Sequence, residues 1–347
     1  MHKMFVNDSD DEDEDEWFYD SMKRYKQLRM FDVENVIKHI ELSDPKSICI
    51  VGEQKSGKHE ILELSLPDKI TVAPSQEGLM KTLWNLRKII ISETGHGGVS
   101  VYKFTCDLVA PLMAINSQQL TLLASKGRSN LVLMDVNTNM TVHNTSLSVN
   151  EAESWIEPSF VSETTAALCN RLTGDVSLHD IRMGKTCSAT PHAKYIPGYE
   201  SKVEELWSMG NSTVNKVNTS LRNDSTKLGI LSSQGKLVIY DLRTSESPLC
   251  RADIGKVCSQ EETVVPTLNF SDDSSNISLS GFDDKVYVFN VSSTDQFKCT
   301  FVHDGHKQQN TSGANCFVTC HTWYKENIVL SASENNSLHC WQFIPND

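Results

Sequence analysis

The sequence lacks a long apolar run. None of its 347 residues lie in a stretch that approaches the roughly 20 apolar residues of a transmembrane helix. It also shows no apolar signal segment, because the first residues read Met-His-Lys and then become acidic. The ten cysteines do not have the spacing of a disulfide framework, and several lie in apolar strand patterns, where free cysteine behaves as a small hydrophobe. These absences favour a soluble, reduced, intracellular protein.

Basic charge is scarce. The chain has 32 Lys and Arg against 45 Asp and Glu, and its formal net charge is −13. Eight acids occupy the nine positions from 8 to 16, and subtracting them leaves only −5 for the rest of the chain. A mildly acidic body argues against non-specific nucleic-acid binding, which needs a basic surface. Because like charges at this density repel one another, we expect residues 1–16 to be a disordered acidic tail.

Hydrolase motifs are missing as well: the sequence has no Gly-x-Ser-x-Gly and no His-Glu-x-x-His. Residues 52–59 do fit Gly-x-x-x-x-Gly-Lys, but a phosphate-binding loop needs Ser or Thr next and must lead into a helix. Here His59 follows, and residues 60–66 alternate like a strand. We therefore expect a hairpin turn, with an ATPase acting through Lys58 as the enzymatic alternative.

A zinc site can be considered at the C-terminal end. Cys316 and Cys320 have a spacing that zinc sites use, but a second pair, His339 and Cys340, consists of adjacent residues, which point to opposite faces of a strand. Core packing explains these side chains better. We therefore assign no catalytic, cofactor-binding or metal-binding residue.

What the chain does contain is a recurring sequence pattern. An apolar run ending in small residues is followed by a polar turn and then by an alternating strand pattern. Copies can be read at residues 47–66, 95–135, 166–180, 228–241, 277–289 and 328–341. Paired strands that recur about every 40–50 residues are typical of a β-propeller. We predict an all-β propeller over residues 31–347, with six readable blades and room for a seventh.

Residues 17–30 follow a different period. Trp17, Phe18, Met22, Tyr25 and Leu28 recur at steps of three and four, which predicts a short amphipathic helix over residues 17–30. This helix either braces the propeller or binds a partner beside the acidic tail, and for the second role Trp17, Phe18 and Tyr25 are the candidate partner-binding residues. The last repeat ends without a fourth strand, and a strand around residues 28–33 would complete it.

Several positions resemble the WD40-repeat family, over about residues 30–345. The resemblance lies in Gly-His pairs and in aromatic-Asp or His-Asp endings at residues 95–96, 305–306, 179–180, 240–241 and 341. No copy has a full Trp-Asp, so the repeats are degenerate. The resemblance implies a WD40-like β-propeller in which His306 joins a buried network with Ser or Thr, Trp and Asp.

The two ends of the chain are more distinctive. Residues 15–32, 61–67, 279–283 and 319–333 resemble one family of WD40-repeat assembly factors. That resemblance implies a non-enzymatic, mainly cytoplasmic scaffold that helps to assemble the Integrator RNA-cleavage module. Its partners would be the Integrator endonuclease subunit, the inactive paralogue of that subunit and a HEAT-repeat protein. It also implies a place at spindle poles in mitosis and a partly nuclear location.

Two Asp-x-Arg sequences suggest a second function. Residues 180–182 and 241–243 resemble the box that some WD40 substrate receptors present to the adaptor of cullin-4 ubiquitin ligases. Arg182 and Arg243 would reach the adaptor as planar, bidentate donors. Ordinary blade closure, with both arginines as surface charges, is the other explanation.

Overall fold

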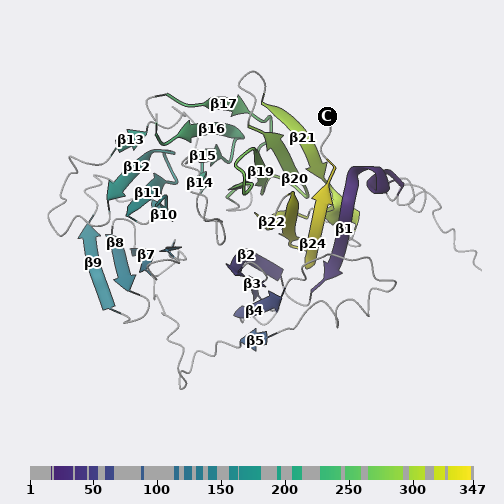
Figure 1. The fold of residues 1–347 in the computed structure, drawn as a ribbon, viewed down its shortest axis with the longest axis horizontal. Helices are drawn as coiled ribbons and strands as arrows, with labels where there is room; N and C mark the ends of the chain where they lie inside the picture. The colour runs from purple at the N-terminus through teal and green to yellow at the C-terminus, as the bar shows by residue number, and fades with distance from the viewer. Residues whose placement is uncertain are drawn as a thin grey trace, which may run out of the picture. The chain divides into compact units, whose positions relative to one another are not determined.

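Figure 1 shows the chain as a computed structural model. The structure describes residues 17, 19–33, 36–44, 47–53, 59–65, 87–89, 113–116, 121–126, 130–135, 140–146, 156–162, 164–180, 194–196, 205–212, 227–243, 247–258, 265–291, 297–308, 316–324 and 327–344.

In these residues the strands form six sheets of four strands each. Their orders are β1(Tyr25–Asp32)-β24(Ser337–Phe343)-β23(Ile328–Ser333)-β22(Val318–Trp323), β2(Val36–Asp44)-β3(Ser47–Glu53)-β4(His59–Ser65)-β5(Arg87–Ile89), β6(Met113–Asn116)-β7(Thr121–Lys126)-β8(Asn130–Asp135)-β9(Met140–Ser146), β10(Ile156–Phe160)-β11(Thr165–Asn170)-β12(Val176–Asp180)-β13(Lys194–Ile196), β14(Trp207–Asn211)-β15(Lys227–Ser232)-β16(Lys236–Asp241)-β17(Cys250–Asp253) and β18(Thr267–Phe270)-β19(Asn276–Ser280)-β20(Val286–Asn290)-β21(Lys298–His303).

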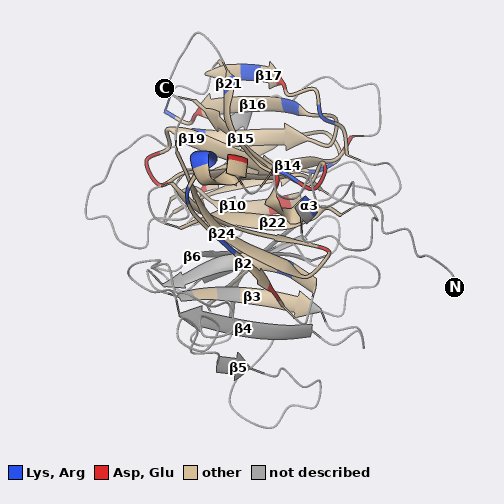
Figure 2. Cartoon of the chain, turned by 90° about the vertical axis from the view of Figure 1, so that its right-hand side faces the viewer, with Lys and Arg blue, Asp and Glu red and all other residues tan. Residues whose placement is uncertain are grey.

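The expected fold class, an all-β WD40-like propeller, is confirmed. Each of the six sequence copies supplies the two middle strands of one sheet, for example β3 and β4 or β23 and β24. The polar turns between these strands are hairpins, because the paired strands are adjacent in the chain and antiparallel. Among the described residues, no helix has both the length and the apolar character needed to cross a membrane. Figure 2 shows charges of both signs scattered along largely neutral strands.

The chain divides into two compact units. The first consists of Met1–Ile89, Asp283–Val288 and Cys299–Asp347, and the second of Ile90–Phe282 and Phe289–Lys298.

In the first unit, the sheet β1-β24-β23-β22 buries both of its faces. Alternate residues of β24 show this, since Leu338 and Cys340 pack with isoleucines of β2 and β3, whereas Trp341 and Phe343 pack with Phe301 and other apolar side chains. Because successive side chains of a strand point to opposite faces, β24 contributes to two hydrophobic cores, one on each side of its sheet.

In the second unit, Trp207 at the start of β14 is completely buried among side chains of β12, β15 and β16. Gly174 lies against its ring, and a Cβ atom placed there would be 2.6 Å from the indole. Gly174 also has a φ of +74°, so this close approach and this backbone conformation both require glycine.

The helix predicted over residues 17–30 is wrong in its second half. Residues 19–24 are helical, but Tyr25 begins β1, which pairs antiparallel with β24. The edge of β24 offers backbone hydrogen bonds that a continued helix would leave unmade, and this pairing overrides the apolar spacing. The strand predicted around residues 28–33 is confirmed, because Leu28 lies opposite Trp341 and the backbone N–H of Val33 donates to the Asn336 carbonyl at 2.8 Å.

The hairpin predicted for residues 52–59 is also confirmed. Glu53, at the end of β3, lies opposite His59, the first residue of β4, and residues 54–58 lie outside the described part of the chain. A phosphate-binding loop places the phosphate at the N-terminus of a helix, whereas this segment leads directly into a strand. Residues 1–16, the predicted acidic tail, also lie outside the described residues.

Candidate functional site

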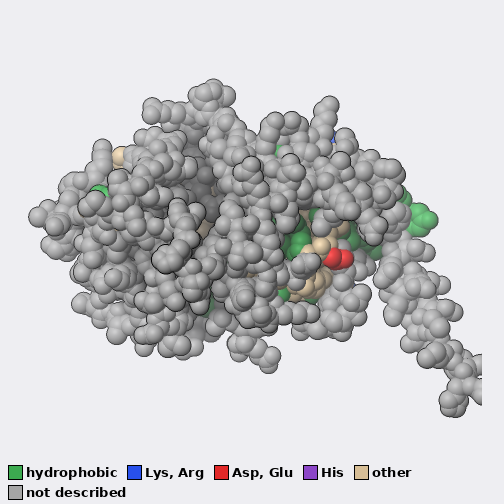
Figure 3. All heavy atoms as spheres, turned by 90° about the horizontal axis from the view of Figure 1, so that it is seen from below, with side chains coloured by type: hydrophobic (Ala, Val, Ile, Leu, Met, Phe, Trp, Pro, Cys, Tyr) green, Lys and Arg blue, Asp and Glu red, His purple; other side chains and the backbone are tan. Residues whose placement is uncertain are grey.

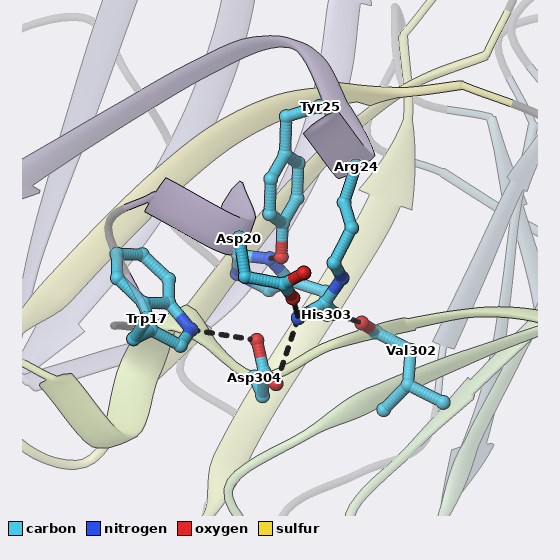
Figure 4. A network of polar contacts seen from close by, with 7 residues as sticks. All are labelled: Trp17, Asp20, Arg24, Tyr25, Val302, His303 and Asp304. Atoms are coloured by element: carbon cyan, nitrogen blue, oxygen red, sulfur yellow. Dashed lines mark hydrogen bonds and ion pairs between the residues drawn. The ribbon is translucent and has the colours of Figure 1, made fainter. Parts of the chain in front are cut away.

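The N-terminal segment is fastened to the first unit by a polar network, which we call the N-terminal clasp (Figure 4). It consists of Trp17, Asp20, Arg24 and Tyr25, together with residues 302–304 at the end of β21. Its centre is Asp304, which accepts a hydrogen bond from Trp17 Nε1 at 3.1 Å and another from Arg24 Nη1 at 3.2 Å. A single carboxylate therefore fixes both ends of the short helix.

Arg24 makes further contacts. It pairs with Asp20, one helical turn earlier, at 3.3 Å, and its other guanidinium nitrogen donates to the Val302 carbonyl. The guanidinium carbon lies 5.4 Å from the centre of the Phe301 ring and 5.5 Å from that of Tyr25. A planar cation can satisfy acceptors at its edge while stacking on rings with its face. Arg24 therefore links the helix to the outer strand β21.

Tyr25 lies inside the clasp rather than on the surface. Its side chain is only 6% exposed, and its hydroxyl is 2.8 Å from His303 Nδ1. Burial raises the pKa of this phenol, so the hydroxyl remains protonated in the folded protein. The ring also makes edge contacts with Phe301 and Trp341, at centroid distances of 5.1 Å and 6.5 Å.

Behind Tyr25 lies a group of three buried histidines. His303 Nε2 is 3.0 Å from His339 Nδ1, and the His339 ring stacks on that of His306 with 3.8 Å between centroids. A neutral imidazole has one donor nitrogen and one acceptor nitrogen. The hydrogen bonds from Tyr25 through His303 to His339 are therefore all donated in the same direction along the chain of side chains. Burial lowers the pKa of His303 and of His339 well below the usual histidine value, and it lowers the pKa of His306 to about 3. All three imidazoles are therefore neutral at physiological pH.

His306 occupies the place that the WD40 resemblance implies. Its two nitrogens bond to the hydroxyls of Ser337 and Ser331 at 2.6 Å and 2.8 Å, and Ser331 also accepts from Trp341 Nε1 at 3.1 Å. The His, Ser and Trp members of the expected network are thus present, but the hydrogen bonds of His306, Ser331 and Trp341 include no Asp, so that part of the expectation is wrong. The three histidines extend it to Tyr25 and so connect the blade network to the clasp.

These three histidines are the one group in the described residues whose nitrogens could together hold a metal, since those atoms lie within 4.8 Å of one another. Neutral imidazoles are good zinc ligands. Five of the six nitrogens, however, already bond to Tyr25, to serines or to one another. The chemistry that this arrangement supports is a buried hydrogen-bond network that holds the N-terminal segment in place.

The other metal candidates do not converge. Cys320 and Cys340 pack in the core beside β2 and β3, whereas His339 lies in the histidine group on the opposite face of β24. Adjacent residues of a strand point to opposite faces, as predicted.

The predicted partner-binding residues have different locations. Tyr25 is buried in the clasp, with a side chain that is 6% exposed, and its role in partner binding stays a prediction. Trp17 is half-buried on Asp304. Phe18 and Arg182 lie outside the described residues. Arg243 is described, and its side chain is 56% exposed and paired with Asp241 at 2.6 Å.

The exposed side of the helix differs from the predicted one. The apolar spacing puts Met22 on one face with Trp17 and Tyr25, but Met22 is 57% exposed and Tyr19 is 62% exposed. The spacing of residues within the helix alone indicates which face is buried. Trp17, buried Ser21 and Arg24 follow steps of four and three, and this places Tyr19 and Met22 on the other side.

Comparison with known proteins finds relatives across nearly the whole chain. The chain is 25% identical to the Integrator complex assembly factor WDR73 of Danio rerio, over 97% of its own length and 98% of that protein. The proteins of the same name from Xenopus laevis and Homo sapiens are 23% and 21% identical, over 93% and 95% of the chain. No family model matches the chain. The resemblance to a WD-repeat assembly factor, expected from the two ends of the sequence, is therefore confirmed and extends over both units.

Proposed function

We propose that this protein is a non-catalytic assembly factor of the Integrator complex, which acts by holding protein subunits together. One observation carries the proposal: relatives from several vertebrates, matched from end to end, are named Integrator complex assembly factors. The fold suits this role, because stiff four-stranded sheets present their loops and edges as fixed binding surfaces. The described polar networks are also structural, since the groups of the clasp bond to one another.

The partners proposed are the Integrator endonuclease subunit, its inactive paralogue and a HEAT-repeat protein. The protein would meet them mainly in the cytoplasm, and would also be found partly in the nucleus and at spindle poles in mitosis. Binding would occur through protein surfaces, without a cofactor, a membrane or direct contact with nucleic acid. A few buried anchor residues dominate most such interfaces.

Affinity purification of the tagged protein from cells of its own species, followed by mass spectrometry, tests this function. We expect the endonuclease subunit and its paralogue to be recovered together, at a level well above that in cells expressing the tag alone. Recovery of other proteins with neither of these subunits would overturn the proposal.

The same experiment tests the second candidate, binding to a cullin-4 ligase adaptor. The observation in its favour is the exposed guanidinium of Arg243. That group is paired with Asp241, so an adaptor would have to compete with an intramolecular ion pair. If this function is correct, the adaptor co-purifies with the wild-type protein and is lost from a variant with Arg182→Ala and Arg243→Ala, while the melting temperature is unchanged.

A further inference from the structure

A pocket opens beside the N-terminal clasp. It has a volume of about 320 Å³ and is lined by Arg24 and by four consecutive residues of β21, Cys299, Thr300, Phe301 and Val302. Successive side chains of a strand point to opposite faces of its sheet, so a pocket lined by four residues in a row follows the edge of the strand. Among the described strands, β21 is the last one in its sheet, and the pocket therefore lies along an outer edge.

Arg24 brings two unused hydrogen-bond donors to this pocket. A guanidinium carries five N–H groups, and within the described part of the chain the acceptors of Arg24 are Asp20, Asp304 and the Val302 carbonyl (Figure 4). Nη1 donates to both carboxylates and Nη2 donates to the carbonyl. The Nε–H and the second N–H of Nη2 can therefore donate to a ligand that enters the pocket.

Charge indicates that this ligand is neutral. The guanidinium is already paired with two carboxylates, Asp20 at 3.3 Å and Asp304 at 3.2 Å, so one positive and two negative groups leave a formal charge of −1. A carboxylate or a phosphate in the pocket would be repelled by both acids at close range. An amide carbonyl accepts the same hydrogen bonds without this repulsion.

The rest of the lining favours an apolar side chain. Phe301 and Val302 form part of the wall, and Cys299 is exposed and so marks the rim. Figure 3 shows, for one face of the molecule, that described apolar side chains, in green, reach the surface at only a few places. The volume is at the lower end of the range for ligand pockets, roughly 300–1,000 Å³, which suits one or two residues of a chain better than a cofactor.

We propose that this pocket binds an extended, uncharged peptide segment of a protein partner. The segment lies along the outer edge of β21, one of its main-chain carbonyls accepts hydrogen bonds from Arg24, and an apolar side chain contacts Phe301. Main-chain hydrogen bonds supply the affinity in this kind of recognition, and the side-chain pocket supplies the specificity. The clasp holds the guanidinium in place before the segment arrives, which lowers the entropic cost of binding. This binding activity is independent of the Integrator role and is added to it.

The test follows the arginine side chain directly. Full-length protein labelled with ¹⁵N at arginine is titrated with the peptide acetyl-Ser-Leu-Val-Leu-Ser-amide. Binding is read from the NMR signal of the Arg24 Nε–H, which is identified by its loss in Arg24→Lys. A second peptide has Asp in place of each Leu and tests whether the pocket accepts negative charge.

Two variants test the location. Cys299→Tyr fills the pocket from its exposed rim and removes none of the clasp residues. The matched control, Leu249→Tyr, adds the same ring beside β17, the last strand of another sheet, at a position that is 53% exposed. Equal melting temperatures check that both variants keep the wild-type fold.

We expect the uncharged peptide to shift the Arg24 signal with a Kd below about 1 mM. The acidic peptide should bind at least tenfold more weakly, as should the uncharged peptide to Cys299→Tyr, whereas Leu249→Tyr should bind like wild type. Tighter binding of the acidic peptide would overturn the class of ligand, and unchanged binding by Cys299→Tyr would overturn the location. A wild-type signal that neither peptide moves would overturn the site altogether. That result would not affect the Integrator role, since the experiment contains no Integrator subunit.

Discussion

The three buried histidines predict that the folded protein is sensitive to mild acid. His303, His306 and His339 are completely buried and neutral, and burial holds the pKa of each below that of an exposed histidine. Below pH 6.5 the unfolded chain therefore binds more protons than the folded one. The free energy of unfolding then falls as the pH drops. Acidification from pH 7 to pH 5 is the perturbation.

The size of the effect follows from His306. Its pKa is about 3 in the folded protein against 6.5 for an exposed histidine, so lowering the pH from 7 to 5 removes about 2 kcal/mol of stability. His303 and His339 act in the same direction. His179 also acts in this direction, because burial lowers its pKa. Glu157 and Asp284 act in the opposite direction, because burial raises the pKa of each carboxyl. Four histidines against two carboxyls leave a net loss, which is a large share of the 5–15 kcal/mol that typically stabilises a folded protein.

The assay is urea unfolding at several pH values between 7.5 and 5, followed by tryptophan fluorescence. The slope of the unfolding free energy against pH reports how many protons are taken up on unfolding. Replacing His339 with Gln should reduce this slope below pH 6 by up to ~1.4 kcal/mol per pH unit. This holds whether or not the replacement changes the unfolding free energy at pH 7.5. A wild-type protein whose stability is constant from pH 7 to pH 5 would refute the reasoning.

Three further predictions concern stability and are checked by the same urea titration at pH 7.5. Tyr25→Phe should lower the free energy of unfolding by about 1–3 kcal/mol, because a nitrogen of His303 loses its partner in the core; a loss below ~0.5 kcal/mol would contradict this. Arg24→Ala should cost about 1–3 kcal/mol, and Arg24→Lys should recover only part of it, since an ammonium group lacks the planar fork. Gly174→Ala should cost clearly more than Gly255→Ala: both have positive φ, but only the first would place a Cβ against an indole ring, whereas the second has nothing within 4 Å.

The paired strands could be predicted because their signal is local. In β23 and β24, for example, two alternating runs surround the polar turn of residues 334–336, and the strands pair directly across it. The same reasoning identified residues 52–59 as a hairpin despite their likeness to a phosphate-binding loop. In both segments the deciding residues lie within about 15 positions of one another, so no knowledge of the distant chain is needed.

The N-terminal segment shows where this approach fails. The apolar residues from Trp17 to Leu28 belong to two elements, a short helix and a strand. Their combined spacing resembles that of one helix only by coincidence. The boundary between helix and strand at Tyr25 is set by pairing with the edge of β24, which lies about 310 residues later in the chain. A periodicity measured within one segment contains no information about that edge. The expectation that the last repeat lacks a fourth strand does take that edge into account. It therefore predicts the strand at the N-terminus correctly, where the apolar spacing does not.

The candidate site was found only in part for the same reason. His306 could be predicted from the Gly-His pair. Its stacking on His339 and the link through His303 to Tyr25 depend on four elements that meet only in the folded protein. Sequence also cannot tell a buried aromatic anchor from an exposed one. Tyr25 and Tyr19 are both tyrosines in the same polar surroundings, and they differ tenfold in exposure, 6% against 62%.

The clasp joins residues that are about 280 positions apart, and this distance has an energetic consequence. Bringing such distant segments together costs loop-closure entropy that grows with the logarithm of the separation. Contacts made by the helix must offset part of that cost. Asp304 bonds to both Trp17 and Arg24, and Arg24 in turn holds Val302, so one short helix is fixed by few residues.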